Sequence, residues 1–218
     1  MIRRQRQGTG RPGIAWWLLL AWCLWLPALA DGTAQGLLRG FFDGLTDYAA
    51  VFDQRLYDET GHLLETSHGR MRIERPDRFR WDYQKPYRQL VLSDGRYLWT
   101  YDPDLAQATR RPLAAAIRGT PAELLAARDG LQRLLARFRV TLGERPGEVV
   151  LTPRGPDGSF QRVRLGFSGR MLTRMVLVDR LGQRTELLFH DPVRNGTPPP
   201  GAFDIQLPPD VDLIDGDA

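Results

Sequence analysis

The alternation of side chains in residues 69–101 is the strongest constraint on how this chain can fold. The apolar and aromatic members of this pattern are Met71, Ile73, Phe79, Trp81, Tyr83, Tyr97, Trp99 and Tyr101. Charged residues stand between many of them, and a period of two predicts strands with one face on an apolar interior and one face in water. The step Arg75-Pro76 interrupts the first run. The pattern predicts a β-wall, and by itself it does not distinguish a packed core from the lining of a cavity.

Residues 1–30 have the features of a signal peptide rather than of a folded domain. Arginines precede an intensely apolar run at 14–26, and Ala28-Leu29-Ala30 then matches a small-x-small cleavage site. The apolar run is shorter than the ~20 residues that a membrane span needs. We therefore expect cleavage after Ala30 and a single domain over residues 31–218, with an uncleaved N-terminal anchor as the alternative.

The composition of the mature chain excludes several classes of protein. Cys23 is the only cysteine, and Trp22 before it is too bulky for a lipidation site. Cleavage after Ala30 removes Cys23, so the mature chain is expected to have no cysteine and no disulfide. Removing the four leader arginines from the 30 basic residues leaves 26, against 26 acidic residues. This balance gives no basic excess for a nucleic-acid surface, so no nucleic-acid partner is expected.

Short amphipathic helices are expected at several places among the strands. They are predicted over residues 35–47, 113–117, from 121 onwards, and 131–138. In the first of them Leu38, Phe41 and Phe42 recur at helical spacing and form an apolar stripe.

The helix that starts at Pro121 has the clearest start signal in the chain. Thr120 suits the N-cap, Pro121 the first helical position, and Glu123 completes a capping box. Leu124 and Leu125 then supply its apolar face.

The remaining segments read as an antiparallel meander. Strands are predicted over residues 51–57, in the segment leading to Gly69, and over 90–92, 97–99, 149–151, 163–167, 171–178, 185–189 and 203–207. Turn residues separate them, as at Ser93-Asp94-Gly95, and residues 210–218 are expected to be a frayed acidic tail. Strands interrupted by short helices predict an α+β domain with its helices on one side of a sheet.

Catalytic and metal-binding motifs are missing from the sequence. The three histidines, His62, His68 and His190, show no HExxH or other ligand spacing and are expected to be solvated. No GxSxG elbow, Gly-rich phosphate loop or mature cysteine nucleophile is present. We therefore expect no enzyme, no metal and no cofactor.

A family resemblance joins these separate features. Its motifs, in order along the chain, are Phe52 and Gln54, Arg75-Pro76 with Phe79 and Trp81, Pro86, residues 90–95, Leu98-Trp99 with Tyr101 and Pro103, residues 107–109, Thr120-Pro121, Leu151 with Pro153, and residues 203–211. In order and spacing they resemble the LolA family, the periplasmic carriers of outer-membrane lipoproteins in Gram-negative bacteria. The resemblance covers nearly the whole mature chain.

The resemblance implies an incomplete antiparallel β-barrel with a lid of short helices over an apolar cavity. It implies that Arg75 latches the lid, with an exposed strand-end arginine as the alternative. The residues expected to line the cavity are Met71, Ile73, Phe79, Trp81, Leu90 and Trp99. The residues expected on the lid helices are Leu38, Phe41, Phe42, Leu124 and Leu125.

The implied function is a monomeric periplasmic carrier that holds lipoprotein acyl chains. Its implied partners are the inner-membrane ABC lipoprotein-releasing complex and an outer-membrane acceptor. The related acceptor family LolB is itself lipidated, which Trp22 before Cys23 argues against. The alternative function is a lipid- or lipoprotein-sensing regulatory module of the same fold.

Overall fold

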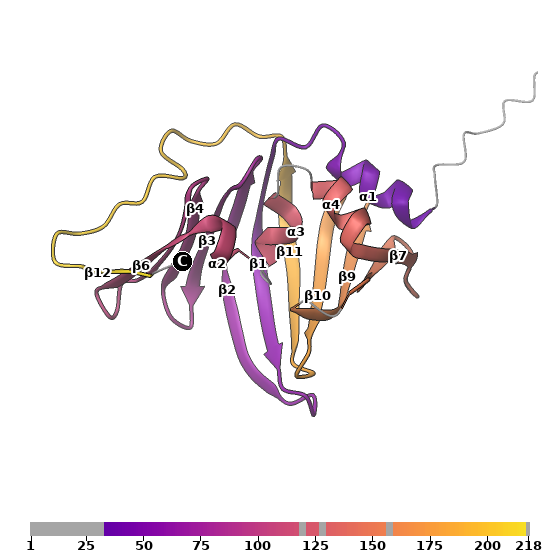
Figure 1. The fold of residues 1–218 in the computed structure, drawn as a ribbon, viewed down its shortest axis with the longest axis horizontal. Coiled ribbons are helices and arrows are strands. Elements are labelled where there is room, and N and C mark those ends of the chain that lie inside the picture. The colour runs from indigo at the N-terminus through magenta and orange to yellow at the C-terminus, as the bar shows by residue number, and fades with distance from the viewer. Residues whose placement is uncertain (1–32, 118–120, 127–129, 156–158, 217–218) are drawn as a thin grey trace, which may run out of the picture.

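The strands of this protein form one twelve-stranded sheet (Figure 1). The computed structural model describes residues 33–117, 121–126, 130–155 and 159–216. The strands are β1 (Asp47–Tyr57), β2 (Leu63–Glu74), β3 (Arg78–Lys85), β4 (Gln89–Asp94), β5 (Tyr97–Asp102), β6 (Gln107–Pro112), β7 (Phe138–Leu142), β8 (Glu148–Pro153), β9 (Phe160–Ser168), β10 (Met171–Asp179), β11 (Arg184–Arg194) and β12 (Asp212–Asp215). Their order is β12-β6-β5-β4-β3-β2-β1-β11-β10-β9-β8-β7. The sheet is open, with β12 and β7 as its edges, and every neighbouring pair is antiparallel except β12 and β6.

Four short helices cover one face of this sheet (Figure 1). They are α1 (Ala34–Phe42), α2 (Leu113–Ala116), α3 (Pro121–Ala126) and α4 (Gly130–Arg137), and we call them together the lid. The α1 helix begins where the Thr33 hydroxyl accepts a hydrogen bond from the Gly36 amide at 3.0 Å, which satisfies one of the free N–H groups of its first turn. The sheet face under the lid is called the inner face, and the opposite one the outer face.

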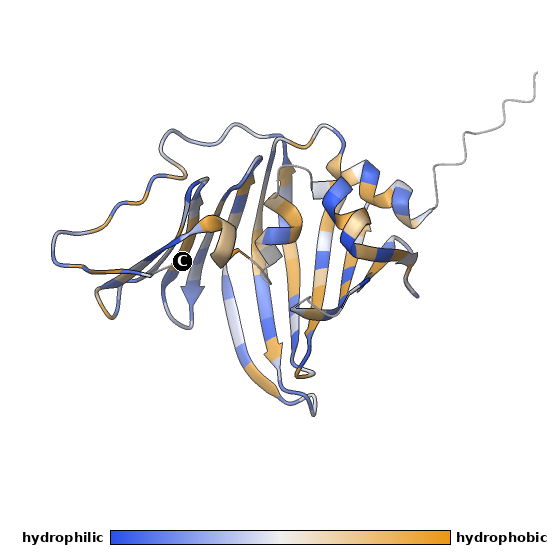
Figure 2. Ribbon diagram, viewed as in Figure 1, coloured by the Kyte–Doolittle hydropathy of each residue, from blue (hydrophilic) through white to orange (hydrophobic). Residues whose placement is uncertain are grey.

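Strand register assigns each side chain to one of these faces. Directly paired residues point to the same side of a sheet, so the pairs Tyr48 with Ile73 and Met71 with Trp81 lie together on the inner face. Orange and blue residues both occur along the strands (Figure 2), and burial alternates most regularly in β9, from Val163 to Phe167. The inner face and the lid share one cluster of buried apolar residues, which we call the interior.

The outer face carries a second apolar patch, covered by the segment between β11 and β12. This segment, residues 195–211, is called the C-terminal strap, and it crosses to the far edge of the sheet (Figure 1). The Arg80 guanidinium donates to the Ala202 carbonyl at 3.3 Å, and Phe203 beside it is buried. A groove of about 380 Å³ remains between the strap and the outer face of β1, β2 and β3.

The structure corrects four sequence-based expectations about the elements. The first helix ends at Phe42 rather than continuing to residue 47, because Gly44 adopts a positive φ of 65° and the chain turns into β1. Residues 107–112 form a full strand, β6, that the sequence analysis did not predict. Residues 203–207 are not a strand, whereas 212–215 in the supposed frayed tail form β12.

The predicted signal peptide and its cleavage site lie outside the described residues. The predicted N-cap Thr120 lies outside them too, although α3 begins at Pro121 as expected. None of the helices in the described part of the chain is both long and apolar enough to cross a membrane.

Replacing Tyr48 by Phe tests the contribution of the hydrogen bond that joins Tyr48 of β1 to Leu172 of β10. The fully buried Tyr48 hydroxyl donates to the Leu172 carbonyl, and burial raises the pKa of Tyr48 above its ordinary value of 10.0. Because the neutral phenol is favoured in the folded state, its contribution is present below pH 10 and is lost as the pH rises through the folded pKa. At neutral pH, Tyr48→Phe should cost about 1–2 kcal/mol, since the carbonyl loses its donor.

Urea unfolding at neutral pH and at about pH 11 measures both effects. The parent should lose more stability between the two pH values than Tyr48→Phe does. Equal losses in the two proteins would show that Tyr48 does not titrate with unfolding.

Candidate functional site: an apolar interior under a helical lid

Four of the residues expected to line a cavity lie together on the inner face. Met71 and Ile73 of β2 pair directly with Trp81 and Phe79 of β3, and all four are at most 5% exposed. The two rings of β3 meet edge to face, with centroids 6.3 Å apart. The sequence pattern therefore placed these residues on the correct face.

The Phe52 ring extends this aromatic group from β3 across β2 to β1. Its centroid lies 6.2 Å from that of Trp81 and 5.2 Å from that of Tyr83. Gly69 makes room for it, because a Cβ there would lie 2.9 Å from the Phe52 ring and 2.1 Å from the Asp82 carbonyl oxygen. Burial raises the pKa of Tyr83 to about 12, so this tyrosine stays neutral at physiological pH.

The predicted lid residues close the interior from the other side. Leu38, Phe41, Phe42, Leu124 and Leu125 are all buried and belong to the same apolar cluster as Met71, Ile73, Phe79 and Trp81. The lid side chains thus occupy the space above the inner face. An acyl chain can enter this space only if the lid side chains move away from it.

Arg75 lies at the junction between the sheet and the lid. Its guanidinium carbon is 5.3 Å from the centroid of the Phe42 ring, a cation–π geometry, and its amide donates to the Thr46 carbonyl at 2.8 Å. A Cβ built on Gly130 of α4 would lie 3.0 Å from the Arg75 Nη2 and 3.1 Å from the Phe42 ring. Arg75 is therefore enclosed between α1 and α4, in a position suited to the latch role that the family resemblance implies.

The turn that carries Arg75 makes a second contact with the lid, through its backbone. The Asp77 amide donates to the Ala126 carbonyl of α3 at 2.9 Å. Asp77 has a positive φ of 66°, a conformation that aspartate adopts more readily than most residues other than glycine. The buried Ser93 hydroxyl donates to the Asp77 carbonyl at 2.7 Å and accepts from the Gly95 amide at 3.1 Å. Ser93 thus holds the turn in the geometry that meets α3.

The α1 helix is attached to the rim of the sheet by charged hydrogen bonds at its C-terminal end. The Arg170 side chain donates to the Gly40 carbonyl at 2.7 Å and to the Asp43 carbonyl at 2.6 Å. Arg194 donates to the carbonyls of Phe41 and Asp43, and burial lowers its pKa, with the nearby Arg170 acting in the same direction. Guanidinium groups suit the partly negative end of a helix.

The α3 and α4 helices contact each other, and each also packs on other elements: α3 on β2 and β3, and α4 on α1 and β7. Arg137 of α4 forms an ion pair with Glu123 of α3, and Leu134 of α4 is buried in the interior. Arg170 and Arg194, from the sheet rim, bond to the C-terminal carbonyls of α1. The α1 helix is thus fastened at its C-terminal end by two guanidinium groups of the sheet rim, whereas α3 meets the sheet at the turn of residues 75–77.

Leu90 and Trp99 do not line the interior, which corrects the sequence-based expectation. Trp81 pairs with Val91, so Val91 shares the inner face and Leu90 points the other way. Trp99 pairs with Leu92, again on the outer face. The phase of alternation is not carried across a hairpin turn, and residues 90–92 are apolar on both faces, so the pattern alone could not assign the side.

Trp99 instead helps to attach the last strand to the sheet. Its Nε1 donates to Asp94 at 3.0 Å, and the Arg110 guanidinium lies 5.4 Å from its ring centroid. Arg110 also forms a bidentate pair with Asp215 of β12, at 2.7 and 2.8 Å. Burial raises the pKa of Asp94, but the hydrogen bonds from Tyr97, Trp99 and Arg96 together hold it below its ordinary value.

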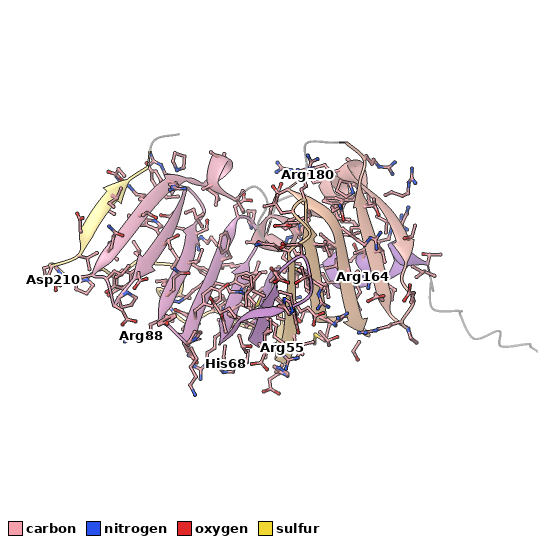
Figure 3. All side chains as sticks on the ribbon, turned by 90° about the horizontal axis from the view of Figure 1, so that it is seen from below. Arg55, His68, Arg88, Arg164, Arg180 and Asp210 are labelled. Atoms are coloured by element: carbon pink, nitrogen blue, oxygen red, sulfur yellow. The ribbon has the colours of Figure 1, made fainter. Side chains whose placement is uncertain are left out.

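His68 lies in β2 and His190 in β11, and their side chains are 43% and 48% exposed, in line with the expected contact with solvent. On the outer face the Asp53 carboxylate is contacted by His68 Nδ1 at 2.8 Å and by His190 Nε2 at 2.9 Å, which lowers the pKa of Asp53. Arg55 and His68 lie on the same side of the sheet (Figure 3). Within the described residues, no group of three or more histidine, cysteine, aspartate or glutamate side chains could hold a metal ion.

Sequence reasoning missed the contacts around Arg75, the residue expected to latch the lid. Gly130, Ser93 and Ala126 belong to three different elements, and no spacing in the chain predicts that they meet around residues 75–77. Gly130 gave no local signal either, because glycine is tolerated at the start of a helix.

An open antiparallel sheet with an apolar inner face under short helices defines a class of half-open barrels closed by a lid. The chain shares this fold with a solved structure, an uncharacterized conserved protein from Thermus thermophilus, at a TM-score of 0.53 and 15% identity over 84% of this chain and 99% of that one. The model of the family described as outer membrane lipoprotein carrier protein LolA matches residues 43–206.

Curated relatives agree with this match over nearly their full length. An outer-membrane lipoprotein carrier protein from Alkalilimnicola ehrlichii is 39% identical over 206 residues, 93% of this chain and 95% of the relative. Another from Chromobacterium violaceum is 37% identical over 194 residues, 88% of this chain and 91% of the relative. The chain belongs to the LolA family of outer membrane lipoprotein carriers.

Gly130 offers a test of how tightly the lid closes. In Gly130→Leu the new side chain must displace the Arg75 guanidinium or the Phe42 ring, so α4 should be pushed outward and the interior opened. An apolar fluorescent dye should then bind more strongly than it binds to the parent. Ala136→Leu is the matched control, because it places the same side chain at an exposed position of the same helix. Dye binding equal to that of the parent in Gly130→Leu would contradict this account of closure.

Proposed function

We propose that this protein is a periplasmic carrier that holds the acyl chains of lipoproteins in its interior and transfers them from the inner to the outer membrane. The observation that carries the proposal is the single apolar cluster shared by the inner face and the lid. Membership in the lipoprotein carrier family and the names of the curated relatives support the same cargo. On this proposal the protein performs no covalent chemistry.

The energetics of acyl transfer explain why such an interior is needed. Each CH₂ group removed from water contributes ~0.8 kcal/mol, so a lipid chain does not cross an aqueous compartment unprotected. In the empty protein, Leu38, Phe41 and Leu125 fill the interior and are fully buried. Cargo and lid therefore compete for the same apolar surface, and the net affinity is smaller than the buried area of the acyl chains suggests.

This competition makes release possible as well as uptake. When cargo leaves, the lid side chains return to the inner face and recover their own burial. The cation–π contact of Arg75 with Phe42 and the bond from the Asp77 amide to the Ala126 carbonyl re-form at the same time. A carrier built in this way takes cargo from a donor and yields it to an acceptor that binds the acyl chains more strongly. The donor and acceptor we propose are the inner-membrane ABC lipoprotein-releasing complex and the outer-membrane lipoprotein acceptor, with the carrier acting as a monomer.

Release of lipoprotein from membranes tests the proposal against the sensing alternative. Spheroplasts that synthesise a labelled lipoprotein should release it into the medium as a soluble one-to-one complex when the purified protein is added. A regulatory module would bind the lipoprotein but leave it in the membrane, and that result would overturn the carrier function.

The two tryptophans of residues 31–218 lie on opposite faces and allow a direct test of the binding site. Trp81 is in the interior and Trp99 is on the outer face. In the Trp99→Phe variant, acyl chains carrying bromine should quench the emission of Trp81 by direct contact. In the matched Trp81→Phe variant, the emission of Trp99 should change little. Equal quenching of both would place the acyl chains outside the interior.

Arg75→Leu tests the latch. Loss of the cation–π contact removes about 0.5–2 kcal/mol from the closed state, so the fold should persist while lid closure and hand-off of lipoprotein to the acceptor fail. Arg78→Leu is the matched control, since Arg78 is exposed and pairs only with Glu74 among the described residues. Delivery by Arg75→Leu at the parental rate would show that Arg75 is not the latch.

A further inference from the structure

A pocket lies at the seam between the lid helices and one hairpin of the sheet, and nothing in the proposed function accounts for it. Its volume is about 460 Å³, within the range of small-molecule sites. It lies between α2, α3, α4 and the turn from β4 to β5, and we call it the seam pocket. Its charged lining residues are Arg96, Arg133, Arg137, Asp77 and Glu123, and its larger apolar ones are Leu113 and Ile117.

The seam pocket adjoins the interior. Leu113 of α2 lines the pocket and is also a buried member of the interior cluster, and Ile117 packs against that cluster. The Leu113 amide donates to the Arg96 carbonyl at 3.0 Å, which attaches α2 to the turn that carries Arg96. A ligand with its chains in the interior would therefore place the groups next to those chains in this pocket.

Two of its three arginines, Arg96 and Arg133, are exposed, so their hydrogen-bond donors are accessible to solvent or to a ligand. Arg137 is occupied by its ion pair with Glu123. Within the part of the chain that the structure describes, the guanidinium groups of Arg96 and Arg133 make no hydrogen bond or ion pair, and Arg96 contacts only the face of the Tyr97 ring, at 5.1 Å. Each guanidinium offers up to five N–H donors in a planar fork.

The chemistry of an acylated ligand matches this arrangement. Ester and amide carbonyls join the acyl chains of a lipidated cysteine to its peptide, so they stand just outside the apolar region. Carbonyl oxygens taken from water without a donor are costly, and buried ones are almost always hydrogen-bonded. Arginine donors beside an apolar wall supply those bonds without competing for the chains.

We propose that the seam pocket binds the carbonyl-bearing linkage of the acylated cargo, with Arg96 and Arg133 donating to its ester and amide oxygens. This inference rests on the proposed carrier function. The seam pocket binds the head of the lipid, whereas the interior binds only its acyl chains. Arg96 comes from the turn between β4 and β5 and Arg133 from α4, so the ligand contacts both sides of the seam.

The test compares two probes on the full chain. One is a synthetic peptide with an S-diacylglyceryl cysteine at its N-terminus, and the other is an apolar naphthylamine dye that lacks ester and acyl groups. The double variant Arg96→Met and Arg133→Met should bind the peptide about tenfold more weakly than the parent, because it loses donors to the carbonyls. Its affinity for the dye should stay at the parental value.

A matched pair of substitutions controls for the loss of charge. Arg139→Met with Arg145→Met removes two exposed arginines that do not line the seam pocket. This control should bind both probes like the parent. A tenfold loss of peptide affinity in the control as well would assign the effect to net charge and overturn the site.

The remaining outcomes separate the inference from the proposed function. If the parent binds neither probe, the carrier function fails. If the double variant binds the peptide as tightly as the parent, the seam site is wrong while the carrier function stands. A loss of dye affinity in the double variant would show that the arginines act on the lid rather than on the ligand head. A third probe, phosphatidylglycerol, tests whether the pocket is an anion site instead. If the double variant lost affinity for phosphatidylglycerol but bound the peptide like the parent, the proposal would also be overturned.

Discussion

The inner face of an open, twisted sheet is apolar along many strands, and something has to cover it. Fully burying one large apolar side chain is worth about 1.5–3 kcal/mol, so leaving this face in water would cost far more than a domain's net stability. The lid provides the cover in the empty protein through residues such as Phe41, Phe42 and Leu125. The same requirement makes the interior suitable for acyl chains, because any apolar ligand that replaces the lid satisfies it equally well.

The lid is not held uniformly. Arg170 and Arg194 fasten the C-terminal end of α1 to the sheet, whereas α3 is joined to the turn at residues 75–77 through the Asp77 amide. The positive φ of Asp77 and the Ser93 hydroxyl beneath it indicate that this turn is shaped for that contact. Opening the lid therefore breaks these specific bonds and also exposes the apolar side chains that the lid buries, unless an apolar ligand replaces them.

Much of the architecture could be predicted from alternation and helix signals. Met71, Ile73, Phe79 and Trp81 fell on the face that the pattern indicated, and the lid helices carried their apolar residues where expected. Trp99 and Leu90 were assigned to the wrong face, because a strand that is apolar on both sides gives no information about which side is inner. The strand β12 was missed because its pairing with β6 depends on contacts distant in sequence.

The parallel pairing of β12 with β6 has a consequence for how the protein is made. Arg110 and Asp215, which bond across this pair, are 105 residues apart in the chain. The edge of β6 therefore has no partner until nearly all of the domain has been synthesised, and contacts of such long range also slow folding. An unpaired edge strand is a template for aggregation. In a chain of this fold the edge of β6 is consequently open to wrong pairing while the chain emerges, even though the finished protein itself shields apolar cargo.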